Sequence, residues 1–156
     1  MLLIKNVQSR VGDNGNCFAA CLAGICDERK LPEFGADDKY WNRVDAYLAR
    51  RGLQYKRVPL SNKPLGYGTI EGISPRGGLH ACVAKDGEMV HDPHPASDDP
   101  RRGLVTPKWY GVLLPLPKEA KDALHIDTDG SVHPDPKPAQ QLKRWATKRF
   151  NLERIT

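Results

Sequence analysis

Apolar residues recur every three or four positions in two segments near the start of the chain, which predicts two amphipathic helices. The first apolar set is Phe18, Cys21, Leu22 and Ile25, and the second is Trp41, Val44, Tyr47 and Leu48. Asn16 or Gly15 precedes the first set and can cap a helix that ends near Ile25. The second helix is expected over 40–51, because the glycine that follows is a common helix terminator.

Shorter apolar segments follow the two helices and predict a series of strands. We expect strands at 53–59, 79–84, 88–91 and 109–116. The stretch 61–78 is rich in glycine and proline and is therefore predicted as loop. Helices first and antiparallel strands later indicate an α+β fold, with N-terminal helices packed on an antiparallel sheet.

The character of the chain changes after Pro117. We therefore predict one folded domain over 1–117 and an appendage over 118–156. In the appendage, a turn is expected at 127–130, a proline-spaced linker at 133–138 and a C-terminal helix from about Pro138.

The predicted C-terminal helix is basic and permits two interpretations. Its charged residues are Lys143, Arg144, Lys148 and Arg149, with Trp145 between them. Such a set can contact phosphates and stack on a base of a nucleic acid. The same helix can instead pack Leu142 and Trp145 on the domain and leave its charges in water, and we favour this second interpretation.

Composition sets broad limits on what the protein does. The chain has 156 residues, 39% of them hydrophobic, and a formal net charge of +5. This length suits one domain with a sizeable core, and the modest basic charge permits an acidic partner without requiring one. The apolar segments are too short to cross a membrane, and residues 1–5 lack the pattern of an export signal. The four cysteines are therefore expected to be reduced thiols in the cytoplasm, or in the host cytoplasm for a phage protein.

Cys17 is the strongest candidate for chemistry. It follows the polar segment 12–16 and stands where the first helix is predicted to begin. The partial positive charge of a helix N-terminus favours the thiolate, which is the nucleophilic form of cysteine. The backbone N–H of Cys17 would also be half of an oxyanion hole. The alternative is a small core residue, which is our interpretation of Cys21, Cys26 and Cys82.

His80 and Asp92 are expected to meet across a β-hairpin. A three-residue loop over 85–87 would pair His80 directly with Asp92, with Cβ atoms about 4.5–5.5 Å apart. A two-residue turn at Asp86 and Gly87 would shift the register by one and break this pairing. In the first case His80 accepts the proton of Cys17, and Asp92 orients the imidazole ring.

Other interpretations of these residues remain open. Asp92 can serve only as a turn former before Pro93, and His91 and His94 can either line a cleft or belong to a rigid loop. The cysteines could also form a metal site, with three histidines as further possible ligands. Structural zinc sites usually repeat Cys-x₂₋₄-Cys pairs, and the second pair is missing here, so we predict no metal.

Four features, taken in chain order, resemble the papain-like cysteine peptidases. They are Gln8, the helix start at Gly15-Asn16-Cys17, His80 at the beginning of a strand and Asp92 at the end of the next strand. This set is most similar to the compact bacterial peptidases that trim double-glycine leader peptides. The segments 74–77 and 91–95 also resemble small papain-like proteins of phages and bacteria. The resemblance covers about residues 1–117.

The resemblance implies a papain-like fold with Cys17, His80 and Asp92 as catalytic triad. Gln8 would complete the oxyanion hole through its amide, with Asn14 or Asn16 as substitutes. The activity implied is a thiol-dependent hydrolase or acyl transferase that acts on an amide of a peptide, an isopeptide or a glutamine side chain, without a cofactor. The partner would be a protein or peptide substrate. A papain-like scaffold can also serve as a non-catalytic interaction protein, for instance an inhibitor of a host enzyme.

In papain-like clefts, the loops at the rim choose the substrate. The corresponding loops here lie just upstream of His80 and next to the hairpin. We therefore expect substrate contacts from Tyr67, Arg76, Gly77 and His94. Arg76 can either bind a carboxylate or carbonyl of the substrate or brace its own loop.

Overall fold

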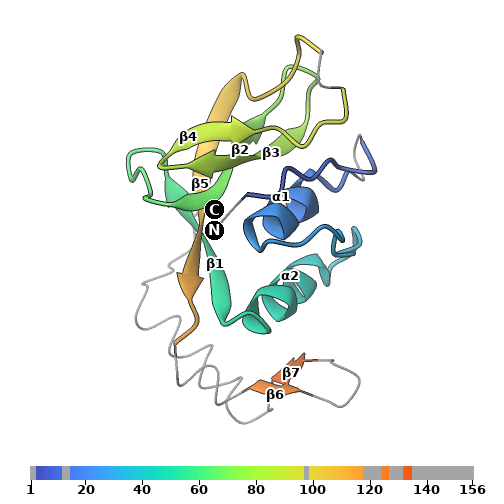
Figure 1. Cartoon of the computed structure of the whole chain (residues 1–156), viewed down its shortest axis with the longest axis vertical. Helices are drawn as coiled ribbons and strands as arrows, with labels where there is room; N and C mark the ends of the chain where they lie inside the picture. The colour runs from blue at the N-terminus through green and yellow to red at the C-terminus, as the bar shows by residue number, and fades with distance from the viewer. Residues whose placement is uncertain (1–2, 12–14, 97–98, 118–123, 127–131, 135–156) are drawn as a thin grey trace. The chain divides into compact units, whose positions relative to one another are not determined.

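The computed structural model describes residues 3–11, 15–96 and 99–117 with their side chains, and the backbone of 124–126 and 132–134 (Figure 1). The chain divides into two compact units. Unit 1 comprises Met1–Val44 and Tyr55–Leu114, and unit 2 comprises Asp45–Gln54 and Pro115–Thr156. All the site residues discussed below belong to unit 1.

The fold is α+β, as the sequence predicts. Two helices, α1 (Cys17–Ile25) and α2 (Tyr40–Ala49), precede a five-stranded sheet of order β1-β5-β2-β3-β4. The strands are β1 (Leu53–Pro59), β2 (Tyr67–Ile73), β3 (Leu79–Lys85), β4 (Glu88–His91) and β5 (Thr106–Pro115). Strand β2 pairs antiparallel with β3 and β5, and β4 pairs antiparallel with β3.

Helix α1 is the centre of unit 1. Every residue from Phe18 to Ile25 is buried, and the helix packs on β3 and β2. The N-terminal segment crosses its last turn, where the Ile4 N–H donates to the carbonyl of Gly24. A Cβ atom at Gly24 would lie 2.3 Å from the Ile4 carbonyl oxygen, so glycine is needed for this close approach. The helix is thus fixed on several sides, and its first residue, Cys17, has a defined position.

The prediction of a loop over 61–78 is wrong for seven residues, because Tyr67–Ile73 forms β2. This strand has a neighbouring strand on each edge. Glycines here accommodate the neighbouring backbone instead of making turns. A Cβ atom at Gly68 would lie 2.4 Å from the carbonyl oxygen of Gly111, and one at Gly72 would lie 2.1 Å from that of Thr106. A glycine count cannot distinguish close strand packing from a turn.

Changing Gly72 to alanine should therefore destabilise the protein by about 2 kcal/mol or more, because the new methyl group meets backbone that cannot rotate away. Urea unfolding measures the loss. Gly77 is the control: it has a φ of 81° but nothing within 4 Å of the new Cβ, so Gly77→Ala should cost about 1 kcal/mol. Equal losses would argue against a tight β2–β5 contact at Gly72.

The C-terminal part differs from the prediction where it is described. Strands β6 (Leu124–Ile126) and β7 (Val132–Pro134) pair antiparallel, so the linker predicted from residue 133 begins within a strand. The turn predicted at 127–130 and the basic C-terminal helix lie outside the described residues. In the described part of the chain, no helix has the length and apolarity that a membrane span requires.

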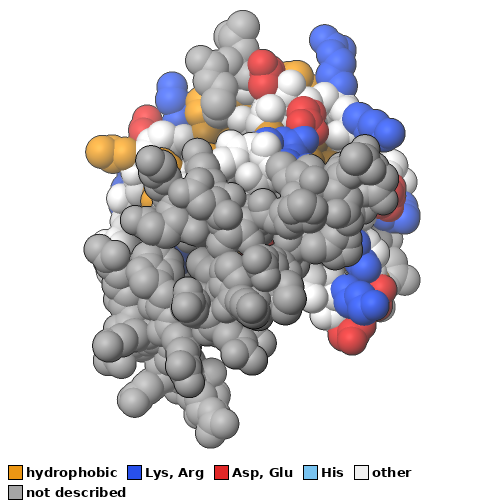
Figure 2. Space-filling model, turned by 90° about the horizontal axis from the view of Figure 1, so that it is seen from below, with side chains coloured by type: hydrophobic (Ala, Val, Ile, Leu, Met, Phe, Trp, Pro, Cys, Tyr) orange, Lys and Arg blue, Asp and Glu red, His pale blue; other side chains and the backbone are white. Residues whose placement is uncertain are grey.

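Charge is mixed on the face shown in Figure 2, where Lys and Arg side chains alternate with Asp and Glu around the visible rim. Among the described residues, exposed ion pairs join Arg43 to Asp37 and Lys63 to Glu88. Interspersed charges of both signs are typical of a solvated surface and do not by themselves indicate a nucleic-acid site.

Candidate active site

Cys17 is the first residue of α1 and is partly exposed, whereas Phe18 and the rest of the helix are buried. Its backbone N–H is among the first four of the helix, which have no acceptor within the helix. All four cysteines are free thiols. Burial raises the pKa of both Cys21 and Cys82, so these two remain protonated core residues at neutral pH.

The segment before α1 is fastened to the helix start by Asn16. The Asn16 Oδ1 accepts hydrogen bonds from the backbone N–H groups of Ser9 and Arg10, both at 3.0 Å, and its Nδ2 donates to Ser9 Oγ at 2.9 Å. Asn16 occupies the N-cap position, yet its side chain makes no capping bond to the helix. The capping role that the sequence suggests is therefore wrong for this side chain. The Asn16 side-chain amide instead holds residues 8–10 beside the helix N-terminus.

Gln8, the predicted oxyanion residue, is buried in that segment. Its backbone N–H donates to the carbonyl of Pro93 at 2.8 Å, and its Nε2 donates to the carbonyl of Arg10 at 2.8 Å. Its Oε1 is buried without a hydrogen-bond partner among the described residues. Gln8 therefore lies between the segment that carries Asp92 and the residues held by Asn16, with its amide only partly satisfied.

His80 and Asp92 are in contact, although not through the register that we expected. The hairpin has a two-residue turn, with Asp86 and Gly87 at positive φ, and Lys85 pairs with Glu88. The register then shifts by one between Ala84, which pairs with Met89, and Val83, which pairs with His91. This bulge leaves Val90 as the extra residue. The predicted direct pairing of His80 with Asp92 is thus wrong.

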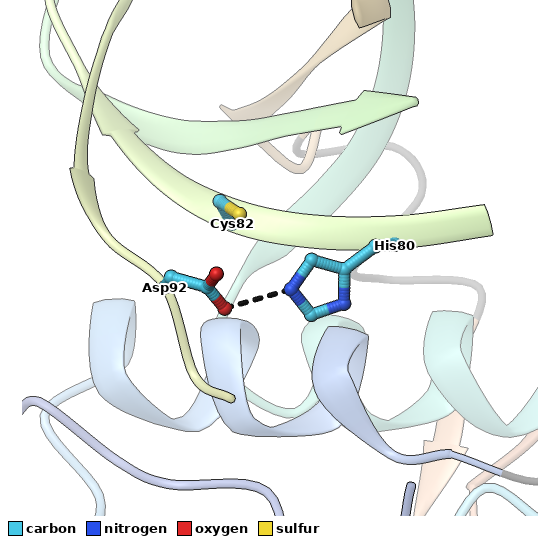
Figure 3. A group of neighbouring side chains, drawn as sticks. All are labelled: His80, Cys82 and Asp92. Carbon is cyan, nitrogen blue, oxygen red and sulfur yellow. Dashed lines mark hydrogen bonds and ion pairs between the residues drawn. The ribbon is translucent and has the colours of Figure 1, made fainter. Parts of the chain in front are cut away.

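The bulge determines which face of the sheet Asp92 joins. Continuing the shifted register by one residue places Asp92 opposite Cys82, on the face that Cys82 shares with His80. Without the extra residue, Asp92 would point to the other face. His80 Nε2 donates to Asp92 Oδ1 at 2.7 Å, and Figure 3 shows the carboxylate facing the edge of the imidazole ring.

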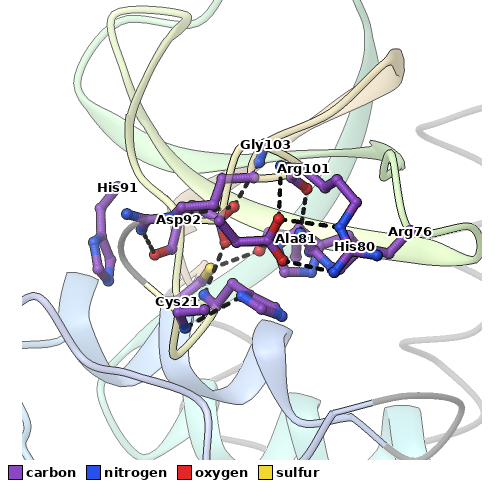
Figure 4. A network of polar contacts seen from close by, with 12 residues as sticks. Cys21, Arg76, His80, Ala81, His91, Asp92, Arg101 and Gly103 are labelled. Carbon is purple, nitrogen blue, oxygen red and sulfur yellow. Dashed lines mark hydrogen bonds and ion pairs between the residues drawn. The ribbon is translucent and has the colours of Figure 1, made fainter.

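The carboxylate of Asp92 is held by backbone donors as well. Its Oδ1 accepts from the His94 N–H at 2.8 Å, and its Oδ2 accepts from the Gly103 N–H at 2.6 Å (Figure 4). Burial alone would raise the pKa of Asp92, but the bond from His80 and those from Gly103 and His94 outweigh it and hold the pKa well below its usual range. Asp92 is thus a fixed anion, which is more than a turn former requires.

The charge of His80 follows from its neighbours. Burial acts to lower its pKa, but the hydrogen bond to Asp92 and further hydrogen-bonding interactions with Cys17 and Cys82 raise it to about 11. Because Nε2 is used by Asp92, the other ring nitrogen, Nδ1, remains for a further hydrogen bond. His80 therefore lies between a carboxylate and the thiol at the start of α1.

Cys17 and His80 line one pocket of about 180 Å³. The other lining residues are Gly15, Phe18, Tyr40, Trp41, Arg57, Glu71, Leu79 and Ala81. This volume is below the roughly 300 Å³ at which pockets for drug-sized ligands begin. The pocket accordingly suits a residue-sized group presented to the thiol.

His80, Cys82 and Asp92 form a buried group whose possible metal-ligand atoms lie within 4.8 Å of one another. The hydrogen bond between His80 Nε2 and Asp92 Oδ1 already joins two of the three ligand atoms at 2.7 Å. The donor set fits an acid–base pair better than a metal centre.

The predicted substrate-contact residues are not among those that line the pocket. Arg76 donates through Nη1 to the carbonyl of Arg101, which ties its loop to another segment of the chain (Figure 4). Gly77 accepts from Ser74 Oγ within its own turn, and the His94 ring accepts from the Ala96 N–H. Tyr67 pairs with Lys85 at one end of the β2–β3 ladder, whereas Gly72 pairs with His80 near the other.

Sequence reasoning missed a polar and aromatic wall of the pocket. Glu71 is buried and accepts hydrogen bonds from Thr69 Oγ1 at 2.8 Å, Trp109 Nε1 at 2.8 Å, Arg57 Nη2 at 3.0 Å and the Tyr55 hydroxyl. Phe18, Trp41 and Tyr55 pack ring against ring beside it. The signal in the sequence that could have indicated this wall is the alternation of Tyr55 with Arg57 and of Thr69 with Glu71. Residues 69–71, however, fall within 61–78, which the sequence predicts as loop.

Comparison with known proteins gave no match among family models, curated proteins or solved structures.

Proposed function

We propose that this protein is a thiol-dependent hydrolase or acyl transferase of papain-like type, which acts on an amide through Cys17, His80 and Asp92. The observation that carries the proposal is the position of His80, which bonds Asp92 through Nε2 and lines one pocket together with Cys17 at the start of α1. A histidine with a purely structural role would not require a thiol at a helix N-terminus in the same pocket.

In the first step the Cys17 thiolate attacks the carbonyl carbon of the amide. A C–S bond forms, and the carbonyl oxygen becomes an oxyanion. The His80 imidazolium donates its proton to the amide nitrogen as the C–N bond breaks, so the amine leaves neutral and the acyl group remains on Cys17 as a thioester. Asp92 stabilises the imidazolium before this transfer and fixes the ring throughout.

In the second step neutral His80 accepts a proton from the incoming nucleophile. The C–S bond breaks and Cys17 leaves as thiolate, so water gives a carboxylic acid and an amine gives a new amide. Both regenerate the thiolate–imidazolium pair that begins the first step. A peptide bond, an isopeptide bond and a glutamine side chain all present the same carbonyl to Cys17. No cofactor takes part in either step.

The backbone N–H of Cys17 stabilises the oxyanion in this proposal, and a side-chain amide supplies the second donor. Gln8 remains our candidate, because its segment is fastened both to Pro93 and, through Asn16, to the start of α1. The Nε2 of Gln8 and the Nδ2 of Asn16 each donate to one acceptor, so each amide keeps a second N–H for an oxyanion. Asn16 is the weaker candidate, since its Oδ1 also accepts from Ser9 and Arg10 and fixes the amide.

The direct test is the alkylation of the native protein by iodoacetamide at neutral pH. Cys17, Cys21 and Cys26 share one tryptic peptide, so fragmentation mass spectrometry must localise the label. We expect Cys17 to react at least tenfold faster than Cys21, Cys26 and Cys82, and His80→Gln to remove most of this advantage, because the imidazolium stabilises the thiolate.

Uniform slow labelling of all four thiols would overturn the proposal and favour a non-catalytic interaction protein. Fast labelling of Cys17 without cleavage or transfer in a lysate would leave a reactive thiol that is not an enzyme. The proposal therefore also requires new peptide termini, deamidated glutamines or new amides when lysate proteins are compared with and without the enzyme by mass spectrometry.

A further inference from the structure

Arg57 on β1 is the one Lys or Arg side chain among the described residues that line the pocket with Cys17 and His80. The side chain is 43% exposed, in contrast to Glu71, its 7% exposed ion-pair partner. The guanidinium carbon lies 4.8 Å from the ring centroid of Trp41 and 4.6 Å from that of Trp109. A cation packed against two indole rings is held in place while one part of it faces the pocket.

Glu71 orients this cation without using up its hydrogen-bonding capacity. The guanidinium has five N–H donors, and the bond from Nη2 to Glu71 Oε2 at 3.0 Å uses one of them. Glu71 also accepts bonds from Thr69, Trp109 and Tyr55, so three neutral donors share in stabilising its charge. The arrangement is that of a preorganised cation with further donors for a ligand.

An arginine fork of this kind matches a carboxylate, which can accept two parallel N–H bonds. Phe18, Tyr40 and Trp41 contribute an aromatic part of the pocket wall, beside Leu79 and Ala81. Apolar groups next to the cation lower the local polarity and so strengthen its attraction to a ligand anion. The pocket thus combines a nucleophile, an acid–base residue and an anion-binding group.

We propose that Arg57 determines substrate specificity by binding a carboxylate of the substrate next to the amide that Cys17 attacks. This inference rests on the proposed function. The carboxylate belongs either to an acidic side chain or to the C-terminus of a peptide. Arg57 replaces Arg76 as the residue that we expect to bind substrate.

The test compares matched anionic and neutral probes of Cys17. Iodoacetate and iodoacetamide form the short pair, and the peptide aldehydes acetyl-Glu-H and acetyl-Gln-H, which add reversibly to a thiolate, form the longer pair. We expect the wild type to prefer the anion of at least one pair. Arg57→Gln should reduce the anion-to-neutral ratio about tenfold, the effect of one charge-assisted hydrogen bond. Arg57→Lys should retain part of the preference, because it keeps the charge and loses the fork.

Arg43 supplies the matched control. It is an ion-paired arginine, bound to Asp37, and it does not line the pocket. Arg43→Gln removes the same charge from unit 1 and should leave both ratios unchanged. Equal ratios for wild type and Arg57→Gln would overturn the inference and leave Arg57 as a structural partner of Glu71. The inference is also overturned if the wild type shows no preference for the anionic probe of either pair. This result can be obtained even if Arg57→Gln does not fold.

Failure of the proposed function has a different signature, which is slow reaction of Cys17 with both members of each pair. The source of the carboxylate is resolved by protection of Cys17 from iodoacetamide. Protection by Glu-containing but not Gln-containing amidated peptides indicates an acidic side chain. Protection by free but not amidated C-termini indicates a terminal carboxylate, and protection by neither kind overturns the assignment.

Discussion

Replacing Cys17 with alanine should reduce amide turnover at least a thousandfold, because no other group can form the thioester. Cys17→Ser should be nearly as inactive, since an alcohol at this position is far less acidic than a thiol. The measurement is turnover of a peptide that the wild type cleaves or modifies in lysate profiling. Both variants should fold normally, because Cys17 is partly exposed and leaves the α1 core intact.

Cys21→Ala is the matched control for this loss. Cys21 is fully buried one helical turn further on, and its thiol donates to the carbonyl of Ala81 at 3.4 Å. Its removal should cost about 1 kcal/mol of stability and leave most of the activity. Equal losses of activity from the two changes would mean that Cys17 is another core thiol.

Changing Asp92 to asparagine should lower the free energy of unfolding by about 3 kcal/mol near pH 5.5, and by clearly less near pH 9. The variant leaves a buried imidazole without its anionic partner, and His80 and Asp92 are both buried in the wild type. Urea unfolding at the two pH values measures the difference between wild type and variant.

The pH dependence follows from the directions of the two pKa shifts. The pKa of His80 is raised to about 11, so its contribution is full below its ordinary value of about 6.5 and decreases as the pH rises toward 11. The pKa of Asp92 is lowered, so its contribution is present above about 3.9 and is lost in acid. The pair therefore stabilises most between about pH 4 and pH 6.5.

Asp37→Asn provides the comparison, because Asp37 also bonds a basic side chain, that of Arg43, but is itself 58% exposed. The loss of stability from Asp37→Asn should be smaller and should be the same at pH 5.5 and at pH 9, since no histidine is involved. A destabilisation by Asp92→Asn that is constant from pH 5.5 to pH 9 would contradict a charged His80–Asp92 pair.

The sequence predicts α1, α2 and most of the strands because each presents a clear apolar period. It also predicts that His80 and Asp92 meet, but for the wrong reason. The direct pairing assumed a three-residue loop, whereas the chain combines a two-residue turn with an extra residue at Val90. Turn length and bulge each shift the register by one, and a local pattern of residues does not specify both.

The wall around Glu71 was unpredictable for a different reason. Its hydrogen bonds come from β1, β2 and β5, and these strands are neighbours only through the order β1-β5-β2. Residue spacing within one segment carries no information about such a crossover. Because the glycines of β2 suggested turns, the strand that carries Glu71 had no predicted place in the sheet.

Asn16 has a consequence for the stability of the protein. An asparagine at an N-cap normally contributes on the order of 1 kcal/mol by bonding the first N–H groups of its helix, but here the side chain bonds Ser9 and Arg10 instead. The helix gives up that stabilisation, because the Asn16 side chain makes no bond to its first N–H groups. In the proposed enzyme, a ligand would supply the missing cap, so that α1 is completed only while the oxyanion is bound.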